Sequence, residues 1–109
     1  MVLAGVATLS EGATALQSVM KQPDAIRPGG PYLYHYFVEA MIRCGLKAEA
    51  RTLMESYWGG MVKNGADTFW EVYDPDQPAL SPYGNPLVNS YCHGWSSTPA
   101  YLLRTGGLI

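Results

Sequence analysis

Charged side chains are scarce in this sequence, and basic ones are particularly few. Lys, Arg, Asp and Glu make up 15% of the 109 residues, whereas about a quarter is usual for a globular domain. Seven basic residues stand against nine acidic ones, and they are spread from Lys21 to Arg104 without a cluster. Because binding to nucleic acid needs a concentrated positive surface, we do not expect nucleic acid as a partner.

Cysteine is equally rare. Cys44 and Cys92 are the only two, they lie in unlike contexts, and no C-x-x-C spacing occurs. Structural zinc sites and redox pairs usually carry such a spacing, so we predict neither, and no metal or cofactor is expected. Cys44 falls on an apolar helical face and is interpreted as a small buried side chain.

A long apolar run is also missing. The opening stretch MVLAGVATL has no basic residue before its apolar part, and it is shorter than the roughly 20 residues that a membrane helix needs. It is therefore interpreted neither as a signal peptide nor as a membrane helix, and no membrane partner is expected. It is typical instead of the end of a helix, and the sequence leaves the compartment open.

Apolar and aromatic side chains are abundant, and they recur at helical spacing. Hydrophobic residues account for 48% of the chain, with eight Tyr, three Trp and five Met. No segment alternates with the period of two that is typical of a strand. At this length the chain forms at most one domain, and the predicted fold class is all-α.

Two of the expected helices are short. The first is predicted to follow Ser10 as its N-cap and to run to Met20. The last is predicted to follow Ser96 or Ser97 as its N-cap, with Pro99 in its first turn, and two glycines after it are expected to end it.

A pair of longer helices is expected between Pro31 and Asn64. Pro31 suits a first helical turn, Gly45 suits a helix end, and Glu39 with Arg43 forms an i,i+4 pair. The short connection at Gly45 predicts an antiparallel hairpin. The positions expected to face the core are Leu33, Phe37, Ala40, Met41 and Cys44 on the first helix and Ala50, Leu53, Met54, Tyr57, Trp58 and Met61 on the second.

The segment from Asp74 to Pro86 contains four prolines and is predicted to be an irregular loop. Unstructured segments of this length in a compact domain are usually functional or mobile. Asp74 and Asp76, on either side of Pro75, are interpreted as turn-forming residues.

An acid beside two aromatic rings is the first candidate for chemistry. Glu71 ends the stretch GADTFWE, directly after Phe69 and Trp70. Burial against an indole disfavours the carboxylate and would raise the pKa of Glu71 toward the range useful for proton transfer. The alternative is an ordinary capping or ion-paired acid, and Asp67 in the same stretch is most simply a loop acid.

A second candidate is the stretch NSYCHGW, Asn89 to Trp95, which combines an amide, two hydroxyls, an imidazole and an indole. Sugar hydroxyls need hydrogen-bonding partners, and the C–H faces of a sugar pack on aromatic rings. The stretch therefore suits a polyhydroxylated ring. The alternative for His93, and for His35 within the expected hairpin, is a structural histidine.

A family resemblance joins these two stretches. The run WGGMVKNGADTFWEVYDP followed by NSYCHGWSSTPAYLL resembles the end of the catalytic domain of bacterial α-L-rhamnosidases, which are six-hairpin glycosidases. The upstream stretch PYLYHYFVEAMIRCGLKAEARTLMESYW resembles the helix pair that precedes this motif. The similarity covers nearly the whole chain.

The resemblance implies that residues 1–109 are a C-terminal part of an (α/α)₆ barrel. It implies that Glu71 is the general base of an inverting hydrolase, that His93 contacts rhamnose, and that Trp70 lines the sugar site. Asp67 and Trp95 are further candidates for sugar contacts. The general acid of this family lies on an earlier hairpin, so the isolated chain is expected to be inactive and to associate with itself.

The sequence departs from the commoner family pattern at two positions. Asp67 stands where many members have threonine, and Cys92 stands where many have asparagine. These departures leave the sugar preference open. The alternatives are another six-hairpin glycosidase or lyase, or a helical sugar-binding or structural module without catalysis.

Overall fold

The computed structural model describes residues 1–109 and contains helices and turns but no strand. The predicted all-α class of helical hairpins is confirmed. The α-helices are α1 (Leu9–Lys21), α2 (Pro31–Arg43), α3 (Lys47–Lys63) and α4 (Pro99–Thr105), and two single 3-10 turns are η1 (Pro86–Val88) and η2 (Gly94–Ser96).

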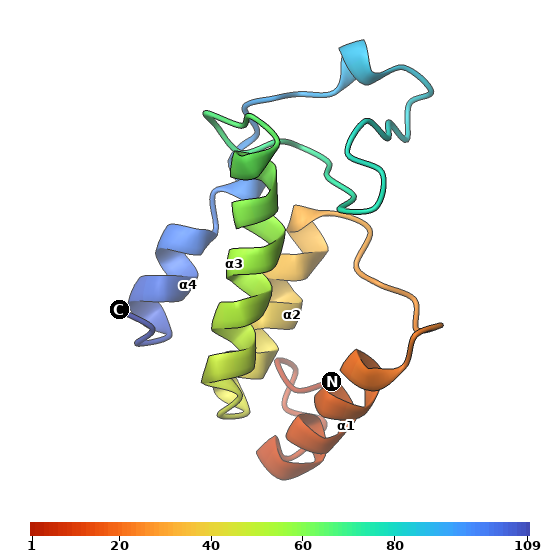
Figure 1. Ribbon diagram of the computed structural model, residues 1–109. Coiled ribbons are helices and arrows are strands. Elements are labelled where there is room, and N and C mark those ends of the chain that lie inside the picture. The colour runs from red at the N-terminus through yellow and green to blue at the C-terminus, as the bar shows by residue number, and fades with distance from the viewer.

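The α2–α3 hairpin is the centre of the molecule. The two helices lie side by side and antiparallel, with α1 and α4 on opposite sides of the pair (Figure 1). Pro31 is the first residue of α2, as predicted. Gly45 lies between α2 and α3 with φ +80°, which a residue without Cβ adopts at little cost. The predicted hairpin is therefore confirmed.

The buried face of α2 matches the predicted one only in part. Ala40 and Met41 are buried as predicted, and so are Tyr34 and Val38, whereas Leu33 is 53% exposed and Cys44 is only partly buried. Because α2 has apolar residues on two faces, spacing alone did not identify the face that meets α3. The face of α3 was predicted correctly: Ala50, Met54, Tyr57, Trp58 and Met61 are all buried.

The N-cap of helix α1 lies two residues before the predicted one. Thr8 is the N-cap, its side chain accepts the Glu11 N–H, and the Glu11 carboxylate accepts the Thr8 N–H at 2.9 Å. This reciprocal pair is a capping box. Ser10 lies inside the helix, where its carbonyl accepts the Thr14 hydroxyl, so the prediction for Ser10 was wrong.

The cap predicted for α4 was also wrong. Thr98 is the N-cap and makes no side-chain capping bond. Ser96 is fully buried, and its hydroxyl donates to the Trp70 carbonyl instead. This hydrogen bond joins the loop before α4 to the loop after α3. Pro99 is the first residue of α4, as predicted, and Leu102 anchors this helix in the core.

The first residues of the chain form a tight turn. The Val6 N–H donates to the Met1 carbonyl at 3.1 Å, the Gly5 N–H donates to the Val2 carbonyl at 3.0 Å, and Gly5 has φ +70°. This pair of bonds is the Schellman motif that ends helices. Gly45 and Gly65 end α2 and α3 with the same pair. The hydrogen bonds of residues 1–6 thus match the helix end predicted from their composition.

The long segment between α3 and α4 is irregular, as predicted. Apart from η1 and η2 it contains only turns and bends, and Asp74 accepts the Asp76 N–H at 2.9 Å in an Asx-type turn. The segment lies over the end of the hairpin at which α3 finishes and α2 begins (Figure 1). None of the helices is both long and apolar enough to cross a bilayer.

Candidate active site

Two segments of the α3–α4 connection pair closely at this end of the hairpin. Backbone hydrogen bonds join the Glu71 N–H to the Ser90 carbonyl at 2.8 Å and the His93 N–H to the Phe69 carbonyl at 3.0 Å. The Thr68 hydroxyl donates to the Tyr91 carbonyl. Residues 68–71 and 90–93 therefore form one unit, although 18 residues separate them in the sequence.

Side chains fasten this unit to the hairpin. The Trp95 indole N–H donates to the Glu71 carbonyl at 2.9 Å, and the Ser96 hydroxyl donates to the Trp70 carbonyl. From α3, the Trp58 indole N–H donates to the Ser96 carbonyl at 2.9 Å. Trp58 is a core residue, as predicted, with 3% of its surface exposed. The loops that carry the candidate residues thus rest on the most tightly packed part of the fold.

The Glu71 carboxylate is held by neutral donors from two sides. Its Oε1 accepts the Tyr83 hydroxyl, and its Oε2 accepts the Ser90 N–H at 3.0 Å. Glu71 is only 9% exposed, and it forms no ion pair. No lysine or arginine occurs between Lys63 and Arg104. The ordinary ion-paired acid, which was one alternative from the sequence, is not what the structure contains.

The pKa of Glu71 lies below its usual range, opposite to the direction expected from the sequence. The hydrogen bond from Tyr83 is the largest cause, followed by the bond from the Ser90 N–H, and His93 adds a smaller favourable effect; together they outweigh the opposing effect of burial. The Trp70 indole, which was expected to raise the pKa, packs against the rings of Tyr73 and Tyr91. Glu71 is therefore a carboxylate at neutral pH and suits a base rather than an acid.

His93 and Trp95 form a stacked pair next to this carboxylate. Their ring centroids are 4.2 Å apart with an interplanar angle of 34°, and the His93 Nδ1 accepts the Trp95 N–H at 3.4 Å. Trp95 is 40% exposed, and its other neighbour is Tyr32 at the start of α2, with centroids 5.5 Å apart. The structure thus brings together Glu71, His93 and Trp95.

The other two candidates are placed differently. Trp70 is partly buried and packed against the core, so it supports the site from behind. Asp67 is exposed and makes no hydrogen bond or ion pair. Its side chain is not linked to Glu71 by any contact.

The sequence did not identify Tyr83 or Tyr32 as neighbours of these residues. Tyr83 lies within the Pro-rich loop and Tyr32 lies on α2, and only the folded chain brings them to the site. One signal was present: the long interval without lysine or arginine meant that a buried Glu71 had to depend on neutral donors.

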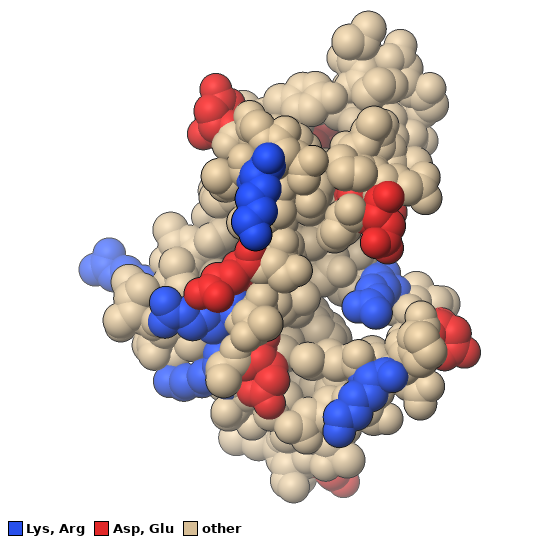
Figure 2. Space-filling model, viewed as in Figure 1, with Lys and Arg blue, Asp and Glu red and all other residues tan.

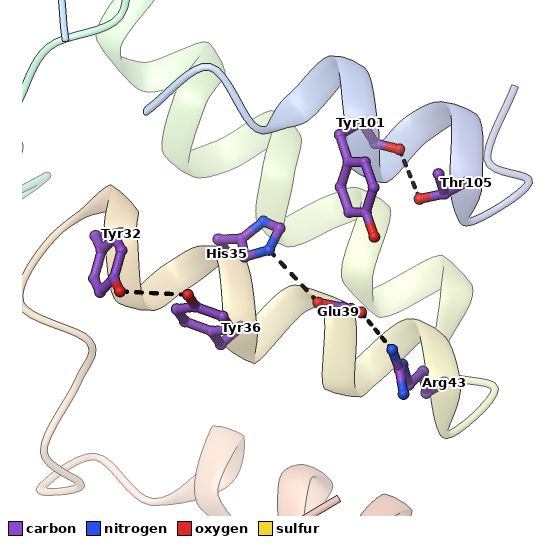
Figure 3. Close-up of polar contacts among 7 residues, drawn as sticks. All are labelled: Tyr32, His35, Tyr36, Glu39, Arg43, Tyr101 and Thr105. Carbon is purple, nitrogen blue, oxygen red and sulfur yellow. Dashed lines mark hydrogen bonds and ion pairs between the residues drawn. The ribbon is translucent and has the colours of Figure 1, made fainter. Parts of the chain in front are cut away.

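His35 was predicted to be a structural histidine. It lies on α2, where its Nε2 is 3.5 Å from a Glu39 carboxylate oxygen, and Glu39 also pairs with Arg43 at 2.8 Å (Figure 3). Its ring packs beside Tyr101 of α4, but its buried Nδ1 has no partner. This chain of contacts joins α2 to α4 and does not reach Glu71.

Charge and metal ligands are sparse around the site. In the view of Figure 2, uncharged atoms cover most of the surface. The α3–α4 connection contains no lysine or arginine, and its charged side chains are the acids Asp67, Glu71, Asp74 and Asp76. No group of three or more His, Cys, Asp or Glu side chains is close enough to hold a metal ion.

Comparison with solved structures gives an informative match. A solved structure described as a rhamnosidase from Klebsiella oxytoca with rhamnose bound superposes with a TM-score of 0.90, at 47% sequence identity over 97% of this chain. The chain spans 21% of that protein. No protein-family model and no curated protein sequence matches. The resemblance seen in the sequence is confirmed: this chain is similar in sequence and in helical fold to a piece of a rhamnosidase.

Proposed function

Starting from this match to a piece of a rhamnosidase, we propose that the chain forms a C-terminal part of the (α/α)₆ catalytic domain of an inverting α-L-rhamnosidase. Glu71 is its general base. One observation carries the proposal: an ionised carboxylate without a cationic partner lies beside a stacked histidine and tryptophan, in a chain 47% identical to a protein that binds rhamnose.

In the proposed reaction, Glu71 accepts a proton from water. In an inverting hydrolase the carboxylate takes this proton while the water oxygen attacks the anomeric carbon. A carboxylate has about four acceptor positions, and Tyr83 and Ser90 occupy one on each oxygen. Positions for a water molecule remain, and the two bonds hold the carboxylate in a fixed orientation.

Sugar contacts in this proposal come from the neighbouring rings. The exposed Trp95 offers a flat surface to the C–H face of rhamnose, and His93 offers a ring nitrogen to a sugar hydroxyl. Trp70 supports the wall behind them. Asp67, exposed four residues before Glu71, is assigned to a hydroxyl farther from the base.

The general acid of this proposal comes from another part of the barrel. The family resemblance places the second carboxyl group on an earlier hairpin. An inverting enzyme needs one, at roughly 6.5 to 9.5 Å from the base, to protonate the leaving oxygen. The isolated chain is therefore expected to show little or no turnover of a nitrophenyl rhamnoside.

Replacing Glu71 in a full-length rhamnosidase that carries this segment tests the proposal. Glu71→Gln keeps the size of the side chain and an oxygen acceptor but removes the base, so kcat should fall by a factor of at least about 10²–10⁴ with the fold intact by circular dichroism. The matched control is Glu55→Gln, since Glu55 lies exposed on α3 and pairs only with Arg51. Wild-type turnover by Glu71→Gln would overturn the proposal.

An apolar hollow beside α2 bears on the association of the chain. It has a volume of about 890 Å³ and lies between the N-terminal turn, α1 and α2. Val19, Leu33 and Phe37 are among its residues, nearly all of which are apolar. Open apolar surfaces of this kind mark contacts with other chain segments. We assign the hollow to the remainder of the barrel in a longer protein and to a second copy in the isolated chain.

A further inference from the structure

We propose that Tyr83, on the Pro-rich loop, is a positioning residue that fixes the orientation of the Glu71 carboxylate and keeps it ionised. The geometry carries this inference, because the Tyr83 hydroxyl donates to Glu71 Oε1 from an element separate from the segments that hold the rest of the site. The inference rests on the proposed role of Glu71 as a base.

The loop is built to present this hydroxyl. The Ser81 hydroxyl accepts the Tyr83 N–H at 3.2 Å and lies 2.9 Å from the Asn85 carbonyl and 2.8 Å from the Asn89 side-chain oxygen. Gly84 closes the turn with φ +79°, and its N–H donates to the Ser81 carbonyl at 3.1 Å. Tyr83 thus projects from a compact turn that is fastened internally.

Tyr83 has no packing reason to lie where it does. It is 55% exposed and is not part of the core, and its hydroxyl donates its hydrogen bond to Glu71. Ser90 donates to the other carboxylate oxygen from a different segment. Two donors from two directions prevent the carboxylate from rotating, which a single donor would allow.

The electrostatic consequence follows from the same contacts. The charged and titratable groups that act on Glu71 are Tyr83 from the loop and His93 from the paired segment. The Tyr83 hydroxyl is the largest cause of the lowered pKa of Glu71, and the same bond raises the pKa of Tyr83. Each group therefore stabilises the other in the protonation state that a base needs.

Titration of Glu71 in the 109-residue chain tests the inference without any catalytic assay. The side-chain carboxyl carbon of Glu71 is followed by ¹³C NMR in the wild type and in Tyr83→Phe, which removes only the hydroxyl. The pKa of Glu71 should rise toward the ordinary 4.5. Tyr101→Phe is the matched control, because Tyr101 is equally exposed and its hydroxyl makes no hydrogen bond. An unchanged Glu71 pKa in a folded Tyr83→Phe chain would overturn the inference.

A second variant tests the hydrogen bond between Tyr83 and Glu71 by changing the turn that carries Tyr83. Ser81→Ala loosens the turn while leaving the Tyr83 hydroxyl in place, so the pKa of Glu71 should move in the same direction by a smaller amount. In a rhamnosidase that carries the segment, Tyr83→Phe should shift the acid side of the kcat profile to higher pH and lower kcat on the plateau, because the Glu71 carboxylate is no longer held in one orientation. A profile that superposes on the wild type would contradict the inference.

The two proposals fail in different ways. An active Glu71→Gln enzyme would remove the role of Glu71 as base and leave the NMR titration unaffected. An unchanged titration in Tyr83→Phe would remove the positioning role of Tyr83 and leave the base in place.

Discussion

The low pKa of Glu71 is due to the groups that donate hydrogen bonds to it, and burial acts in the opposite direction. It has little exposed surface, yet its partners favour the charged form so strongly that its pKa falls. Neutral donors have a further property that a lysine or arginine lacks. In the proposed reaction, they stabilise the carboxylate without placing a cation beside the water molecule that loses its proton to Glu71.

The lowered pKa of Glu71 predicts how stability depends on pH. A carboxyl group with a lower pKa in the folded than in the unfolded chain stabilises the fold above its unfolded value of about 4.5 and loses this effect as pH falls through the folded value. Between about pH 5 and pH 3 the wild type should therefore lose stability more steeply than Glu71→Gln. Urea unfolding at a series of pH values measures this difference. Glu11 also has a lowered pKa, but it is present in both chains and cancels in the comparison.

At the residue scale the sequence singled out candidate residues but not their electrostatics. Glu71 and His93 were singled out because each stands in a short stretch with an unusual mixture of side chains, and the structure brings the two together. The direction of the pKa shift was wrong because it depends on Tyr83 and Ser90. These lie 12 and 19 residues away from Glu71, and no local rule links them to it.

Glycines with positive φ set the ends of the helices. Gly5, Gly45, Gly65 and Gly107 each follow a helical turn with φ between +61° and +97°. In all four places the N–H of the next residue reaches back five residues to a carbonyl. The same motif therefore ends α2, α3 and α4 and fixes the direction in which the chain leaves them, whereas α1 ends at Gln22 without a glycine.

Replacing one of these glycines should destabilise the hairpin. Gly45→Ala places a Cβ in a left-handed conformation, which costs about 1 kcal/mol, although nothing lies within 4 Å to cause a clash. The free energy of unfolding in urea should fall by that amount. Gly29→Ala is the control, since Gly29 also has open space around it but no positive φ. Equal stability of the two variants would contradict the explanation.

At the element scale, prediction succeeded where the signal was local. Pro31 and Gly45 mark helix ends through their own backbone preferences, and the stripe on α3 is long enough to be unambiguous. The N-cap of α1 was missed although the sequence contained the signal: Thr8 is followed three residues later by Glu11, which is the pattern of a capping box. The orientation of α2 could not be predicted, because it depends on which of two apolar faces α3 covers.

The whole molecule exposes more surface than its mass accounts for. A compact protein of 11.9 kDa exposes about 5,900 Å², whereas this chain exposes 6855 Å². The excess of about 900 Å² is close to the roughly 800 Å² that each partner buries in a typical stable interface. Helix α1 contributes to this surface, because it lies at the edge of the molecule (Figure 1) and Gly12 is its only buried residue.

Association of the isolated chain can be tested on the apolar hollow. Leu33 lines it and is exposed, so Leu33→Lys should shift the chain toward monomer, because burying an unpaired charge in an apolar contact is costly. Val62→Lys is the matched control, because Val62 is equally exposed on α3 but does not line the hollow. Light scattering over a dilution series measures the mass of each variant. A wild type that is monomeric at micromolar concentration would contradict the prediction.

Because residues 68–71 pair with residues 90–93, the position of Glu71 and its acid strength can change independently in evolution. Since the ends of the intervening stretch are joined by hydrogen bonds, residues can be inserted or lost between them at a small entropic cost, and the acid keeps its place beside the imidazole. The strength of that acid, by contrast, depends on which side chain the stretch supplies at position 83. Related chains with the same scaffold could thus adapt to different acidities by exchanging one exposed loop.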